Sequence, residues 1–217
     1  METMTTIGPL SLIAALILAS AFLLASRTRL RALVQLFRFQ ACALVAYLLW
    51  SAWQFGEAHL VLIAAFVCAL KVVVMPSMLL SIAKKSGAAE RLALFIRPAT
   101  LTFVTTAAIG AAVAIARILA FDHKLFLVTV SFSLVLIGFL MLVVHKSLFG
   151  QSVGFLMLEN GVFFLGLTVA EQMPLFVELG VLFDLLALLV LATALIRRVQ
   201  ETHASATTDY LQALNDL

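Results

Sequence analysis

Seven runs of predominantly apolar residues, each about long enough to cross a lipid bilayer, decide what this sequence can fold into. A helix rises about 1.5 Å per residue and the hydrocarbon core of a bilayer is about 30 Å thick, so roughly 20 apolar residues span it. The runs lie at residues 7–25, 32–53, 58–83, 99–121, 125–145, 152–170 and 174–196. We therefore predict an all-α, polytopic integral membrane protein of about seven transmembrane helices.

The composition agrees with a lipid environment and excludes several classes of function. The chain is 64% hydrophobic and 12% charged, whereas about a quarter of the residues of a soluble domain are charged. Its net charge of +3 comes from short basic clusters between apolar runs, which argues against nucleic acid as a partner. Cys42 and Cys68 lie inside apolar runs, so we expect core cysteines without a disulfide or a thiolate metal site.

The basic residues also predict the topology, because cytoplasmic loops carry an excess of lysine and arginine. Lys124 stands alone on the opposite side. The basic side has Arg27, Arg29, Arg31, Lys84, Lys85, Arg91, Arg97, Lys146, Arg197 and Arg198. We expect the N-terminus outside and the C-terminus, with a polar tail over 199–217, in the cytoplasm. Since the first run precedes its basic cluster, we interpret it as a retained helix and not as a signal peptide.

Prolines mark two kinds of position in this pattern. Pro98 and Pro174 stand at expected helix starts, where a missing N–H is tolerated. Pro76 lies within the third run, where it removes a backbone hydrogen bond and is expected to kink the helix beside Lys71.

Ionisable side chains deep in the apolar runs are the candidate functional residues. Lys71 is near the middle of the third run, and a charge at that depth costs several kcal/mol unless it has a partner or water. Glu159, followed by Asn160, is expected roughly 10 Å from the cytoplasmic end of its helix, if that helix starts near Ser152. Nearby glycines, Gly154, Gly161 and Gly166, permit close helix approach or small hydrated gaps.

The last run adds Asp184 near its centre and Glu178 closer to its outer end. For Lys71 a structural ion pair that fixes helix packing is the alternative to a proton path, and Glu178 is also interpretable as an interfacial carboxylate. If Lys71 approaches one of the acids, its withdrawal favours protonation of that acid. His145 marks the cytoplasmic end of the fifth run as an interfacial histidine, with proton uptake as the alternative.

The sequence resembles the hydrogenase-4 component E family, membrane subunits of group 4 NiFe hydrogenase and formate hydrogenlyase-type complexes. The similarity is in Leu70-Lys71-Val72 with Pro76, in Gly154-Phe155-Leu156-Met157-Leu158-Glu159-Asn160-Gly161, in Pro174-Leu175-Phe176-Val177-Glu178-Leu179-Gly180 with Asp184, and in Leu211-Gln212-Ala213-Leu214. The last three helices of that family are similar to the small K-type subunit of respiratory complex I, which carries two membrane-embedded glutamates. By helix order Glu159 takes the place of the first glutamate, whereas Asp184 and Glu178 both remain candidates for the second.

The resemblance implies a four-helix region over 1–121, a K-type-like region over 122–198 and the tail over 199–217. It implies a subunit of the bacterial inner membrane whose partners are antiporter-like and hydrogenase membrane subunits. The sequence has no CxxC pair, glycine-rich phosphate loop or HExxH motif. We therefore expect no enzyme activity and no cofactor in this chain, with the NiFe and iron–sulfur centres in partner subunits.

Three functions follow from these observations. The first is a non-catalytic membrane-arm subunit that couples hydrogenase redox chemistry to ion movement, with a proton path through Lys71, Glu159 and Asp184. The second is a structural spacer or anchor in the same complex. The third is a freestanding small transporter, which the asymmetric layout without a recognisable inverted repeat disfavours.

Overall fold

The computed structural model describes residues 3–85, 91–119 and 124–169. The predicted seventh helix at 174–196, with Glu178 and Asp184, and the tail over 199–217 lie outside the described residues. The described part is helical, and it forms no strand. In chain order the elements are α1 (Thr3–Ala25), α2 (Leu30–Phe55), α3 (Ala58–Val67), the π-helical segment η1 (Cys68–Val74), α4 (Met75–Lys85), α5 (Pro98–Ile118), α6 (Leu125–Val144) and α7 (Leu148–Val169).

Six helical spans in the described residues are long and apolar enough to cross a membrane. The elements α3, η1 and α4 run on without a break and count as one span, Ala58–Lys85. These six correspond to the first six predicted runs, with ends that differ by a few residues. Pro98 starts α5, as its lack of an N–H predicted.

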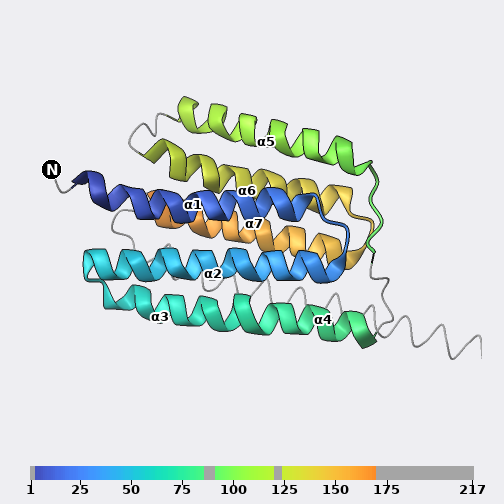
Figure 1. Ribbon diagram of the computed structural model, residues 1–217, viewed down its shortest axis with the longest axis horizontal. Helices are drawn as coiled ribbons and strands as arrows, with labels where there is room; N and C mark the ends of the chain where they lie inside the picture. The colour runs from blue at the N-terminus through green and yellow to red at the C-terminus, as the bar shows by residue number, and fades with distance from the viewer. Residues whose placement is uncertain (1–2, 86–90, 120–123, 170–217) are drawn as a thin grey trace, which may run out of the picture.

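The spans form a bundle in which α2, α6 and α7 are the most buried and α1 packs against α2 and α6, with two further elements at its sides (Figure 1). On one side α5 packs against α6, and on the other the α3–η1–α4 span packs against α2. Of the most apolar window in each span, 56% is buried in α6 and α7, against 22% in α5. The predicted boundary near residue 121 falls between α5 and α6, which pack against each other.

The outer surface of the bundle is apolar, as a lipid-facing surface must be. Trp53, Leu62 and Phe103 are among the large hydrophobic side chains exposed on it. Exposed apolar surface of this extent marks a membrane or protein contact. Cys42 is exposed on this surface as well, so the prediction of a core position is wrong for it, and Cys68 is half-buried.

Glycines bring α6 and α7 together more closely than any other side chain would allow. A Cβ atom added to Gly138 would lie 2.5 Å from the backbone nitrogen of Leu158, and one added to Gly161 would lie 2.7 Å from that of Val135. Gly154 faces Met141 in the same way. In lipid, helices associate through such close packing and through polar contacts. The predicted role of Gly154 and Gly161 is confirmed.

One end of the bundle gathers the basic residues, and we call it the basic end. There the segment 91–97 connects the α1–α2 turn to the α6–α7 turn: Leu92 N–H donates to the Thr28 carbonyl (2.7 Å) and Phe95 N–H to the Val144 carbonyl (2.9 Å). The start of α2 and the end of α4 lie at this same end (Figure 1), so the basic residues that the sequence assigned to one side are found together there. The described members are Arg27, Arg29, Arg31, Lys84, Lys85, Arg91, Arg97 and Lys146.

The backbone beside Pro76 is irregular, but in a different form from a simple kink. Residues Cys68–Val74 are π-helical, and Met75 N–H donates to the carbonyl of Leu70, five residues earlier. Pro76 has no N–H with which to continue that register on the Lys71 carbonyl. Single π-helical insertions of this kind are frequent at functional sites.

A larger side chain at position 161 tests the packing of α6 against α7. Gly161→Ala places a methyl group against the Val135 backbone, and we expect the free energy of unfolding to fall by about 1–3 kcal/mol. Gly110→Ala on α5 is the matched control, because a Cβ there meets no atom within 4 Å. The measurement is unfolding in sodium dodecyl sulfate followed by circular dichroism, and equal stability of the two variants would contradict the observed packing.

Candidate functional site

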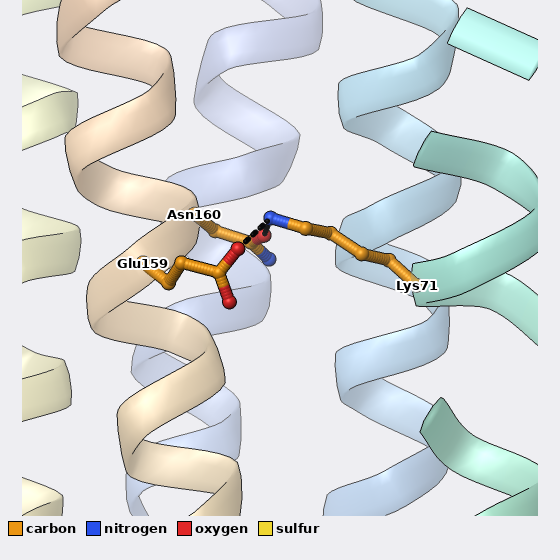
Figure 2. A network of polar contacts seen from close by, with 3 residues as sticks. All are labelled: Lys71, Glu159 and Asn160. Carbon is orange, nitrogen blue, oxygen red and sulfur yellow. Dashed lines mark hydrogen bonds and ion pairs between the residues drawn. The ribbon is translucent and has the colours of Figure 1, made fainter. Parts of the chain in front are cut away.

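Two of the predicted residues, Lys71 and Glu159, meet in the interior of the bundle. The Lys71 Nζ atom lies 3.0 Å from Glu159 Oε1 and donates a hydrogen bond of 2.7 Å to Asn160 Oδ1 (Figure 2). The lysine and glutamate side chains are 0% and 1% exposed. Residues 89 positions apart in the sequence thus form one polar cluster.

Both charged residues lie near the middle of their spans. Lys71 belongs to η1, and both η1 and α7 pack against α2. α7 begins at Leu148, four residues before the predicted start. Glu159 is therefore about 16 Å from the basic end of its helix, not the predicted 10 Å. This correction places the carboxylate near mid-membrane depth, where snorkelling to an interface is most difficult.

Electrostatics explains why these two side chains need each other. An ammonium or a carboxylate loses several kcal/mol of hydration when it is buried alone, and an opposite charge in contact offsets much of that loss. The ring of Phe163 adds a weaker attraction, with its centroid 5.4 Å from Lys71 Nζ. The charge of the lysine is thus held between a carboxylate, an amide oxygen and an aromatic face.

The pair is matched in charge but not saturated in hydrogen bonds. The contact at Glu159 Oε1 is an ion pair without the angles of a hydrogen bond, and Glu159 Oε2 has no hydrogen-bond partner among the described residues. The Asn160 Nδ2 group also has none in the described part of the chain. Buried carboxylate and amide atoms are nearly always hydrogen-bonded to protein or to ordered water.

The other predicted residues have different outcomes. Glu178 and Asp184 lie outside the described residues. His145 follows α6 at the basic end, as predicted, but it is 0% exposed and thus not at an open interface. Desolvation lowers the pKa of His145, against a smaller opposite effect of its contact with the Met141 carbonyl. A neutral ring is therefore expected at physiological pH.

One buried polar residue, Gln40 on α2, was missed by the sequence reasoning. Its side chain is 0% exposed, and neither amide atom has a hydrogen-bond partner within the described ranges. The available signal was that two glutamines, Gln35 and Gln40, lie inside the apolar run at 32–53. That signal does not reveal whether the side chain faces the bundle or the lipid.

No group of three or more His, Cys, Asp or Glu side chains in the described residues could hold a metal ion. The chemistry that the cluster itself can perform is proton exchange at the Glu159 carboxylate, with Lys71 as the compensating charge.

Comparisons with known proteins find a sequence that is similar over most of the chain, but they assign no activity. The sequence matches no protein-family model, and no solved structure matches it. It is similar to the uncharacterized protein Rv0085 of Mycobacterium tuberculosis, with 29% identity over 205 residues that cover 93% of each chain. The similarity therefore includes the spans that carry Lys71 and Glu159.

Proposed function

We propose that this chain is a non-catalytic membrane-arm subunit of a complex I-like NiFe hydrogenase complex, in which the Lys71–Glu159 pair takes part in proton transfer. The observation that supports it best is the ion pair itself, buried at mid-span between η1 and α7. Intramembrane ionisable residues that face the bundle interior are typical of proton and ion pathways. The resemblance to the hydrogenase-4 component E family supplies the kind of complex.

The transfer step follows from the charge balance of the pair. While Lys71 Nζ stays 3.0 Å from Glu159 Oε1, both side chains keep their charges. When the ammonium moves away, the carboxylate is left alone in an apolar interior, and taking up a proton removes its charge. Return of the ammonium favours release of that proton. The pair thus links a movement of Lys71 to the loading of Glu159.

Asn160 provides a contact that Lys71 can keep when it moves away from Glu159. Its Oδ1 accepts from Lys71 at 2.7 Å and belongs to the residue next to Glu159. The neutral Asn160 amide accepts a hydrogen bond from the ammonium whether or not Glu159 is charged, so Lys71 remains bonded when the carboxylate is protonated. The amide therefore reduces the energy difference between the two states of the pair.

The orientation and the surroundings are part of the same proposal. The basic end faces the bacterial cytoplasm, in line with the excess of basic residues in cytoplasmic loops. The segment 174–196 supplies a seventh span, with Asp184 or Glu178 as the next proton carrier. Antiporter-like and hydrogenase membrane subunits contact the lipid-facing surface, and the metal centres belong to those partners.

The coupling of the ion pair can be measured as a free energy. Lys71→Met and Glu159→Gln should each lower the free energy of unfolding by about 3 kcal/mol, because each leaves one buried charge without its partner. The double variant should lose less than the sum of the two. Unfolding in sodium dodecyl sulfate, followed by circular dichroism, provides the four values of the cycle.

A second cycle serves as the control for the first. It combines Lys71→Met with Glu57→Gln, since the exposed Glu57 carboxylate is 3.5 Å from His59 and takes no part in the cluster. Distant sites are additive within about 0.5 kcal/mol. Additivity in the Lys71 and Glu159 cycle too would show that the two side chains do not interact in the folded protein.

The function itself is tested in the native complex. Affinity purification from native membranes should recover large hydrogenase and antiporter-like subunits with this chain. Glu159→Gln and Lys71→Met should leave the complex assembled and its hydrogenase activity present, while proton transfer falls by about 10²-fold, the contribution of a positioned proton-transfer group. Glu57→Gln should retain wild-type coupling.

Each other outcome points to a different protein. Intact proton coupling in both Glu159→Gln and Lys71→Met would favour the structural spacer. Recovery of this chain without hydrogenase subunits would defeat both the coupling and the spacer functions. Substrate-driven flux through the chain reconstituted alone would establish the freestanding transporter.

A further inference from the structure

Four buried polar atoms on α2 and α7 lack hydrogen-bond partners in the described part of the chain. They belong to three side chains that are 0–1% exposed: Glu159 contributes Oε2, Asn160 contributes Nδ2, and Gln40 contributes both atoms of its amide. A buried polar group without a partner costs about 1–3 kcal/mol. Internal water molecules usually satisfy such groups, with two to four hydrogen bonds each.

The ring contact between Tyr47 and Phe164 fixes the register of α2 against α7. The two ring centroids are 4.8 Å apart, and both helices begin at the basic end and run in the same direction (Figure 1). Gln40 precedes Tyr47 by seven residues. Around the helix axis this is a rotation about 20° short of two full turns, and along the axis it is a distance of about 10.5 Å. Gln40 thus shares the α2 face that Tyr47 turns toward α7.

The same reasoning places Asn160 opposite Gln40. Asn160 precedes Phe164 by four residues, about 40° beyond one turn and about 6 Å along the axis. The two amide residues therefore face each other across the α2–α7 contact, offset by about 4.5 Å along the bundle. Since the amide atoms of Gln40 and the Nδ2 atom of Asn160 have no hydrogen-bond partner in the described residues, a water molecule between the two side chains can bond to both.

We propose that Gln40 and Asn160 hold internal water against Glu159 Oε2, and that this water delivers the proton that Glu159 takes up. The inference rests on the proposed function, because it supplies the immediate proton donor for the same carboxylate. In the step, a hydronium ion at this position transfers one proton to Oε2. An O–H bond forms on Glu159 as one breaks on the hydronium, and neutral water remains.

The amide of Gln40 suits this task because it does not ionise. It offers one acceptor and two donor hydrogens at pH values where Glu159 changes its charge. It can therefore orient water in both protonation states of Glu159 without adding a charge to the site. Gln40 is a positioning residue, and Glu159 is the group that carries the proton.

Infrared difference spectroscopy tests the water site directly. Spectra of the full chain in native membranes are recorded between acidic and alkaline buffer, in ordinary water and in water labelled with oxygen-18. We expect at least one O–H stretching band that shifts with the label. Gln40→Met should abolish this band and slow proton uptake, while the Glu159 carboxyl band persists.

The matched control changes another glutamine of the same helix. Gln54 accepts a hydrogen bond of 3.1 Å from Trp50 Nε1 near the other end of α2, so Gln54→Met should leave the water band unchanged. Gln40→Asn, which keeps an amide, should shift the band without abolishing it. This variant also provides the measurement if Gln40→Met does not fold.

The results separate the water site from the proposed function. A label-sensitive band that survives in Gln40→Met, or no such band in the wild type, overturns the water site even if Glu159→Gln abolishes proton coupling. Loss of the band in Gln40→Met supports the site even if coupling in Glu159→Gln is intact. In that case only the proposed function fails.

Discussion

The contact between Lys71 and Glu159 determines how the rest of the bundle has to be arranged. Each side chain alone would be an uncompensated charge near mid-membrane depth, so the α3–η1–α4 span and α7 must bring them together. In lipid no hydrophobic effect drives one helix onto another. Polar contacts and close packing therefore decide which helices are neighbours, and this pair connects an outer span to the interior of the bundle.

The two sides of the pair have different backbones. Glu159 stands on α7, which the glycines Gly138 and Gly161 lock against α6 at distances that leave no space for a Cβ. Lys71 lies in the π-helical segment η1, on a peripheral span. The π-helical hydrogen bonds stop after Met75, because the next residue, Pro76, has no N–H to donate. A rigid carboxylate thus faces an ammonium on a less regular backbone. If one of the two side chains moves, we expect it to be Lys71, because its backbone is the less regular one.

The sequence predicted the six described spans and the buried positions of Lys71 and Glu159, because both are local properties. Hydrophobic runs and the depth of Lys71 can be read along one helix, and Pro98 marked the start of α5. Neighbour relations are not local, so the 89-residue separation between Lys71 and Asn160 concealed their contact. Pro76 indicated an irregular helix but not its π register, and Gln40 and Cys42, two residues apart, gave no sign that only Gln40 faces inward.

The Lys71–Glu159 pair has an energetic cost that purely apolar packing would not have. Apolar side chains of similar volume usually hold helices together as well as a buried ion pair, without the loss of hydration. Lys71 compensates the charge of Glu159 at Oε1, and Oε2, which has no protein partner in the described residues, is the atom to which the proposed water binds. A carboxylate with an ammonium at one oxygen and water at the other can gain and lose a proton. Proton exchange at Glu159 thus gives a reason, under the proposed function, for a buried ion pair that packing alone does not require.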